Sequence, residues 1–150
     1  MTETLIKPAE ASDADRLTAL IQNCSAYRGA YAAMIAGYRV TPEYLARHEV
    51  HLAVRAADDL LLGFYALVTD PVPDLDLMFV ADEAQGLGIG RLLITHMLDR
   101  ARAVGITGGI KVVSHPPAEA FYLRMGAERV GTFPAKPPIG WDRPELRFTV

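Results

Sequence analysis

The stretch from Val80 to Arg91, "VADEAQGLGIGR", decides how the middle of this sequence folds. An apolar run, Leu75–Val80, precedes the stretch, and apolar residues that recur every three to four positions follow it from Ile89 onward. This spacing predicts a strand, a glycine-rich turn and a helix in direct succession. Such a turn presents unpaired backbone N–H groups at the positive end of a helix dipole, which is a typical binding site for phosphate. A simpler interpretation is that the glycines only permit a tight turn.

Two familiar nucleotide motifs do not fit these glycines. The dinucleotide-binding fingerprint needs a third glycine three residues after Gly88, but Arg91 stands at that position. The phosphate loop of nucleotide hydrolases needs a Gly-Lys-Ser/Thr ending, which the sequence lacks. An anion bound at this turn would therefore belong to neither of these two motifs. Gln85 and Arg91 flank the turn and could donate hydrogen bonds to it.

The bulk composition narrows the class of protein. A chain of 150 residues is the size of one domain, so we expect residues 1–150 to form a single domain. A net charge of −3 without clustered Lys and Arg argues against nucleic-acid binding. Cys24 is the only cysteine, and the four histidines show no metal-ligand spacing, so no metal is expected. The sequence has neither a signal peptide nor a long apolar run, which predicts a cytoplasmic protein without membrane contact.

The chain alternates between strand and helix patterns in an order that predicts the fold class. We expect strands at Thr4–Lys7, His51–Arg55, Leu60–Val68, Leu75–Val80, 109–114, Arg129–Phe133 and Leu146–Val150. We expect helices after an N-cap at Ser12, after Thr41 with Pro42 at the first helical position, from Ile89 to Gly105, and at Ala118–Met125. This order predicts an α/β fold built on a single-layer, mixed, mostly antiparallel twisted sheet of six to seven strands, with helices on both faces. Residues 75–113 form its one clear parallel crossover.

Two segments resemble a known family. The pattern V-x-x-x-x-Q-G-x-G-I-G-x-x-L spans Val80–Leu93, and A-E-A-F-Y-L-x-M-G-A spans Ala118–Ala127. Both are similar to the signature segments of the GNAT superfamily of acyl-CoA-dependent N-acetyltransferases, and the likeness is specific over residues 75–131. The resemblance implies a sheet splayed between its fourth and fifth strands, with acetyl-CoA in the cleft. It also implies transfer of the acetyl group to a primary amine of a small molecule or a peptide.

The resemblance also implies roles for individual residues. Tyr122 matches a tyrosine that faces the sulfur of CoA, and Met78, Phe79 and Val80 would offer backbone groups to the pantetheine arm and the thioester oxygen. Pro117 replaces an asparagine that often contacts the cofactor, which puts one hydrogen bond in doubt. The residues that the resemblance places on the pyrophosphate are Gln85, Gly86, Leu87, Gly88, Ile89, Gly90 and Arg91.

Acetylation of an amine needs a proton for the departing thiolate and a base for the amine. A phenol suits the first task, so Tyr122 is the candidate general acid, although a tyrosine at the edge of an apolar helix often only packs. Asp76, which shares a strand face with Asp74, is the candidate base; the alternative is a solvated turn. His115 is a further candidate base, beside two prolines that favour a plain loop.

The acceptor site is expected in the irregular segment 25–40 and the proline-rich loop 134–145. Tyr27, Tyr31 and Trp141 are candidates to line it, although aromatic residues also fill secondary cores. A non-catalytic acyl-CoA sensor of the same fold is the alternative function. A last strand ending at Val150 would leave a sheet edge that a second copy could cover, which favours a homodimer.

Overall fold

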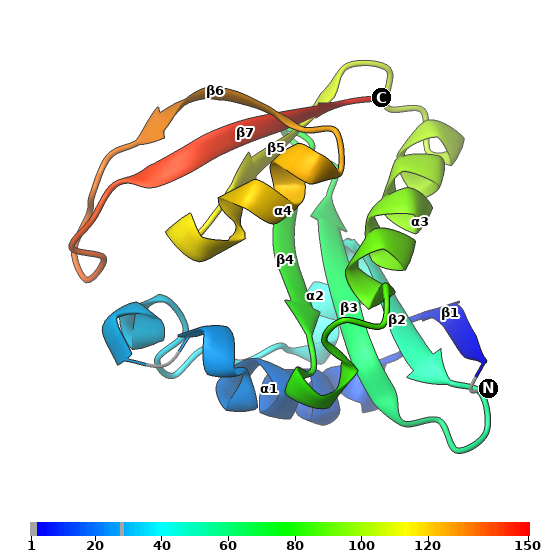
Figure 1. Cartoon of the computed structure of the whole chain (residues 1–150). Helices are drawn as coiled ribbons and strands as arrows, with labels where there is room; N and C mark the ends of the chain where they lie inside the picture. The colour runs from blue at the N-terminus through cyan, green and yellow to red at the C-terminus, as the bar shows by residue number, and fades with distance from the viewer. Residues whose placement is uncertain (1–2, 28) are drawn as a thin grey trace.

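The computed structural model describes residues 3–27 and 29–150, which contribute seven strands to one sheet (Figure 1). The strands lie in the order β1-β2-β3-β4-β5-β7-β6, and β4 and β5 form the parallel pair while the other neighbours are antiparallel. The predicted mixed, mostly antiparallel sheet is therefore confirmed. The strand bounds are β1 Thr4–Pro8, β2 Glu49–Arg55, β3 Leu61–Val68, β4 Asp74–Val80, β5 Gly109–Val113, β6 Glu128–Phe133 and β7 Arg143–Thr149.

Helices cover both faces of the sheet, as predicted. Helices α1 (Ala14–Asn23) and α2 (Pro42–Arg47) bury apolar side chains with Phe64 and Phe79 on one face. Helix α3 (Ile89–Ala103) buries its apolar stripe with Tyr65 on the other face, where α4 (Glu119–Arg124) also packs. Figure 1 shows the two pairs of helices on opposite sides of the strands. Short 3₁₀ turns complete the set: η1 Ala11–Asp13, η2 Ser25–Tyr27, η3 Gly29–Met34, η4 Asp82–Ala84 and η5 Pro116–Ala118.

The two predicted N-caps have different outcomes. Thr41 caps α2, because its side-chain oxygen accepts a hydrogen bond from the Tyr44 backbone N–H at 3.1 Å, and Pro42 holds the first helical position. The cap at Ser12 is wrong, since Ser12 lies inside η1 and α1 begins at Ala14. Asp13 is the side chain that reaches the backbone here, where it accepts a hydrogen bond from the Glu10 N–H at 2.7 Å.

The sheet splits between β4 and β5, as the resemblance implied. The two strands pair only at Asp74 and Lys111, and the Lys111 backbone N–H donates to the Pro73 carbonyl at 2.9 Å. Strand β4 also carries a bulge, because Leu75 pairs with Leu67 and Leu77 with Ala66, which leaves Asp76 without a β3 partner. A bulge bends its strand and increases the local twist. Beyond Asp74, the described part of β4 therefore turns away from β5 and leaves one backbone edge without a register partner.

The last strand does not form an edge of the sheet, so that prediction is wrong. Strand β7 lies between β5 and β6, and the edge strands are β1 and β6. The physical reason is burial: β7 carries the fully buried Leu146 and Phe148, whereas β6 is exposed along most of its length. A second copy that extends the sheet would have to pair with β1 or β6. Among the described residues, no helix has the length and apolar character needed to cross a membrane.

Candidate active site

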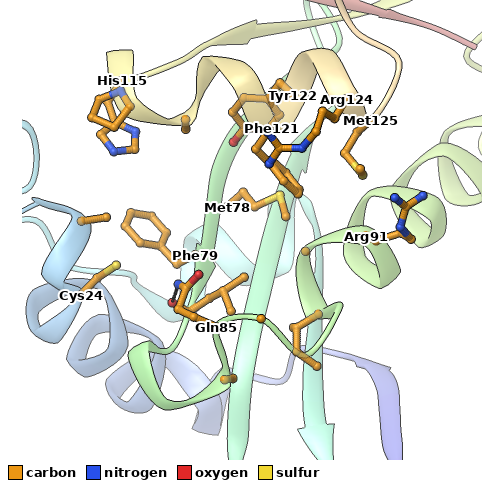
Figure 2. A pocket seen from close by; sticks show the side chains of 18 of the residues that line it. Cys24, Met78, Phe79, Gln85, Arg91, His115, Phe121, Tyr122, Arg124 and Met125 are labelled. Atoms are coloured by element: carbon orange, nitrogen blue, oxygen red, sulfur yellow. Dashed lines mark hydrogen bonds between the residues drawn. The ribbon is translucent and has the colours of Figure 1, made fainter.

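A cavity of about 520 Å³ opens where β4 and β5 separate (Figure 2). Its walls come from the end of β4, the turn that follows it, the first turn of α3, the loop after α1, and α4 with the segment before it. The lining residues are Cys24, Ala26, Tyr27, Met78, Phe79, Val80, Ala84, Gln85, Gly86, Gly88, Ile89, Gly90, Arg91, His115, Pro117, Ala118, Phe121, Tyr122, Arg124 and Met125.

The turn between β4 and α3 has a backbone that only glycine adopts at low cost. Gly86 and Gly88 both have φ of +79°, in the left-handed region, and Gly88 is the N-cap residue directly before α3. Gln85 closes the turn, because its side-chain amide donates to the Val80 carbonyl at 3.1 Å. The first N–H groups of a helix have no partner within that helix, so the start of α3 offers hydrogen-bond donors and a positive dipole end to an anion.

Two arginines add positive charge to this cavity. Arg91 lines it from the first turn of α3 and Arg124 from α4, and both side chains are exposed (Figure 2). In residues 3–27 and 29–150, no carboxylate forms an ion pair with either guanidinium. Together with the helix start, the arginines suit a ligand with several negative charges, such as a diphosphate. Sequence reasoning missed Arg124, whose one signal is its place two residues after Tyr122 on the same helix.

Close packing of α4 on α3 requires the third glycine of the turn. A Cβ atom at Gly90 would lie 2.9 Å from Cζ of Phe121 and 3.6 Å from Cε of Met78. Figure 2 shows Phe121 and Met78 converging beside the start of α3. Gly90 therefore lets α4 approach the phosphate-binding turn, and α4 carries Tyr122.

Tyr122 is buried at the junction of two cavities. Only 8% of the residue is exposed, and its ring packs against Phe121 and Phe148. Burial, with a smaller contribution from Tyr27, raises the pKa of the Tyr122 phenol well above its usual value of about 10. The hydroxyl therefore stays protonated and can donate a proton or a hydrogen bond.

A second cavity, of about 220 Å³, lies on the other side of this junction. It shares five lining residues with the first cavity: Tyr27, Met78, Phe79, His115 and Tyr122. The remaining lining residues come from α1, η3 and the loop after it, β4, β5 with the residue that follows it, and the start of β7. Two molecules bound in the two cavities would meet beside Tyr122.

The aromatic residues expected at the acceptor site form a continuous series of ring contacts. Tyr27 stacks on His115 with ring centroids 4.3 Å apart, and Tyr31 meets His115 edge-on at 5.6 Å. Tyr31 in turn meets Trp141 edge-on at 5.2 Å. The structure thus brings Tyr27, Tyr31 and Trp141 together through His115, from segments far apart in the sequence.

His115 is better placed than its sequence context suggested. It is 7% exposed, and its Nε2 atom has no hydrogen-bond partner among the described residues. Burial lowers the pKa of the imidazole, so the neutral form dominates at neutral pH. A neutral imidazole that lines both cavities can accept a proton.

Asp76 lies on the bulge of β4 and lines the second cavity only. Its carboxylate accepts a hydrogen bond from the Tyr44 hydroxyl at 2.5 Å. Burial raises the pKa of neighbouring Asp74, and the charge of Asp76 raises it further, so the two carboxyl groups interact. This concentration of negative charge suits the binding of an ammonium group.

The other predicted cofactor residues also line the first cavity, with one exception. Leu87 is 67% exposed and is not part of the wall. Pro117 does line the cavity and lies in η5, where a proline costs no helical hydrogen bond. The described residues contain no group of three or more His, Cys, Asp or Glu side chains that could hold a metal. Besides Arg124, sequence reasoning gave no site role to six further lining residues: Cys24, Ala26, Ala84, Ala118, Phe121 and Met125.

This site combines three features: a sheet that splits between β4 and β5, a glycine turn before a helix, and two cavities that meet. Proteins of this class bind a ligand in the cleft between the end of a strand and the start of a helix. A sequence model described as an acetyltransferase (GNAT) domain matches residues 24–133, which is most of the chain. The chain therefore belongs to the GNAT acetyltransferase family. No curated protein sequence matches it significantly.

Solved structures show the same fold at low sequence identity. A GNAT-family acetyltransferase from Streptococcus pneumoniae superposes with a TM-score of 0.77 at 19% identity, covering 99% of this chain and 100% of that one. The ribosomal-protein-S18-alanine N-acetyltransferase from Escherichia coli gives 0.74 at 15% identity, with 99% and 94% covered. N-acetylglutamate synthase from Neisseria gonorrhoeae, in complex with coenzyme A and N-acetyl-glutamate, gives 0.72 at 23% identity, with 99% of this chain and 35% of that one covered.

Proposed function

We propose that this chain is a single-domain N-acetyltransferase that moves an acetyl group from acetyl-CoA to a primary amine of a small molecule or a peptide. The observation that carries the proposal is the meeting of two cavities at Tyr122, directly beside the split between β4 and β5. The first cavity would hold the acyl donor and the second the acceptor amine. A single domain is supported by the sheet, whose strands come from Thr4 to Thr149.

The first cavity has a donor set that suits coenzyme A. The start of α3, Arg91 and Arg124 would bind its phosphate groups, because all three present positive charge or N–H donors. The backbone groups of Met78 and Val80, which alternate with the β3-facing backbone of Phe79, would bind the pantetheine amides in the manner of an added strand. The same backbone N–H groups would hold the thioester oxygen as negative charge develops on it.

The acetyl-transfer step then needs little more than positioning and proton transfer. The amine nitrogen attacks the thioester carbonyl carbon, a C–N bond forms, and the C–S bond breaks when the tetrahedral intermediate collapses. We assign Tyr122 as the general acid that gives its phenolic proton to the leaving thiolate. Burial raises the pKa of Tyr122, and burial of the CoA sulfur beside it would likewise disfavour the charged thiolate, so the transfer would stay close to balanced.

Two residues are candidates for the proton acceptor of the amine. Asp76 lines the acceptor cavity as a carboxylate held by Tyr44, and we propose that it attracts the ammonium form and takes the proton. His115 is the alternative, and its buried, unpaired Nε2 at the junction of the cavities favours it. Separate Asp76→Asn and His115→Gln variants distinguish them. The variant that removes the base should have a lower kcat than the wild-type protein, while its affinity for acetyl-CoA stays unchanged.

Turnover of a Tyr122→Phe variant tests the proposal. The assay measures release of the free CoA thiol with a panel of amines, and calorimetry measures acetyl-CoA affinity. General acid catalysis contributes about 10²- to 10⁴-fold, so kcat should fall by that factor while acetyl-CoA affinity persists. Tyr65→Phe is the matched control, because Tyr65 is buried beside α3, bonded to His96 and outside both cavities.

The alternative function is an acyl-CoA sensor of the same fold. Binding of acetyl-CoA by both the wild-type protein and Tyr122→Phe, without turnover of any amine, would support the sensor. Unchanged turnover in Tyr122→Phe would remove Tyr122 from the mechanism.

A further inference from the structure

The second cavity carries opposite charges on its walls. Asp76, from β4, and Arg143, from the start of β7, both line it. We propose that the acceptor amine also bears a carboxylate, so that the acceptor is a small amino acid rather than a simple amine. This inference rests on the proposed function, because it names the acceptor of that same site.

Buried hydrogen-bond donors without acceptors are the first support. The Nε atom of Arg143 and the Nε1 atom of Trp141 are both buried, and neither has a hydrogen-bond partner among residues 3–27 and 29–150. Both atoms are donors only, so only a hydrogen-bond acceptor can satisfy them. Leaving such a group unpaired is costly, and native proteins contain few of them. Arg143 lines the second cavity, so an oxygen-rich ligand there would complete its donor, whereas Trp141 lines neither cavity and stands two residues before Arg143.

The second support is the positive charge gathered around Phe133, of which Arg143 is the member that lines the cavity. The guanidinium carbon of Arg143 lies 4.9 Å from the ring centre of Phe133, and the Nζ atoms of Lys136 and Lys111 lie 5.0 and 5.5 Å from the same centre. No described carboxylate forms an ion pair with any of the three. A ring's negative face attracts cations but does not neutralise them, so a negative ligand remains favoured.

Backbone pairing fixes where this positive end lies. The Ser114 N–H donates to the Pro144 carbonyl at 3.0 Å, which holds Arg143 beside the segment that carries His115. Arg143 also lies opposite Phe133 in the β6–β7 register. Trp141 stands further out, joined to His115 through Tyr31. The carboxylate would therefore lie toward β7 and the loop before it.

The negative end binds the other charge of the acceptor. Asp76 accepts a hydrogen bond from Tyr44. Burial raises the pKa of Asp74, and the charge of Asp76 adds a smaller increase. An ammonium group beside Asp76 and a carboxylate beside Arg143 would match the cavity at both ends. The volume of about 220 Å³ also suits a small molecule, because pockets for drug-sized ligands span roughly 300–1,000 Å³.

Matched acceptor pairs test the inference. Each pair consists of an amino acid and its carboxamide, which keep the amine and the side chain and differ in the charge of the carboxyl group. Loss of a charge-assisted hydrogen bond lowers kcat/KM about ten- to a hundredfold, so the wild-type protein should prefer the acid by that factor. In Arg143→Gln the preference should fall to near one, while turnover of the carboxamide persists. Arg147→Gln, on the same strand but outside both cavities, should keep the preference.

Fluorescence of the wild-type protein gives a second measurement that needs no variant. Trp141 is the only tryptophan and stands two residues before Arg143, so a carboxylate bound beside Arg143 should change its emission. Saturable quenching by amino acids, and not by their carboxamides, supports the inference.

The outcomes separate the two levels of the argument. Equal acetylation of acids and carboxamides overturns the inference and leaves the acetyltransferase standing. Acetyl-CoA binding without acetylation of any amine overturns the proposed function, and absence of selective quenching in the same protein then overturns the inference as well.

Discussion

Substitution of Gly63 by alanine adds one methyl group at the point where β3 packs against β4. A Cβ atom at Gly63, in β3, would lie 2.7 Å from the backbone carbonyl oxygen of Phe79 and 3.3 Å from side-chain atoms of Ile89 and Leu93. Cβ atoms do not approach a backbone oxygen that closely, so β4 must shift. The shift falls on Phe79 and on the start of α3, both of which line the first cavity.

The expected loss of stability is the difference of two effects. Overpacking in a well-packed site costs about 1–3 kcal/mol. Removing a glycine from a strand interior returns about 0.5–1 kcal/mol. The net loss is about 0–2.5 kcal/mol, which corresponds to a fall in Tm of up to about 10 °C for a chain of this size. Acetyl-CoA affinity should fall as well, because a shift of β4 also displaces Met78 and Val80, which line the first cavity.

Gly131→Ala provides the control for this experiment. Gly131 lies in β6, where an added Cβ meets no atom within 4 Å, and its φ is not positive. Alanine there should be neutral or stabilising by up to about 1 kcal/mol. Thermal unfolding followed by circular dichroism measures both variants. If Gly63→Ala unfolds at or above the temperature of Gly131→Ala, the close approach of β3 to β4 is refuted.

Three further predictions follow from the same geometry. If Tyr122 is the acid and His115 the base, kcat should be flat from below pH 6.5 to above pH 10. The reason is that burial raises the pKa of Tyr122 and lowers the pKa of His115. A descending limb near pH 9 in a pH–rate profile would contradict this. Gly90→Ala should weaken acetyl-CoA binding in calorimetry, since the new Cβ displaces the ring of Phe121, and unchanged affinity would show that the ring does not shape the site. Thr41→Ala should cost about 1 kcal/mol in urea unfolding through loss of the α2 cap, and an unchanged midpoint would remove that cap from the stability of the protein.

Much of the fold could be predicted because its signals are local. The glycine turn follows a strand and begins a helix, and the apolar periodicity after Ile89 places one face of α3 in the core. The left-handed φ angles of Gly86 and Gly88 explain why a glycine stands at each position. The parallel crossover from β4 to β5 followed from the same segment, since a strand, a helix and a strand in succession favour it.

The remaining features depend on contacts between distant residues. Nothing local in the sequence shows that Asp76 is a bulge residue, because the bulge is defined by the pairing of β4 with β3. The burial of His115 results from Tyr27, which stacks on it from the loop after α1. The position of β7 between β5 and β6 depends on whether β6 or β7 buries more apolar side chains in the core. Arg143 is likewise a site residue only because β7 lies there.

Calorimetric titration with acetyl-CoA measures whether the first cavity is the donor site. The wild-type protein should bind acetyl-CoA with micromolar affinity, and a double variant, Arg91→Glu with Arg124→Glu, should bind at least about tenfold more weakly because it replaces attraction of phosphate by repulsion. Arg47→Glu is the control, since Arg47 is exposed on α2 and lines neither cavity. Binding that survives in the control and is lost in the double variant is the result that we predict. Absence of binding by the wild-type protein would contradict the account.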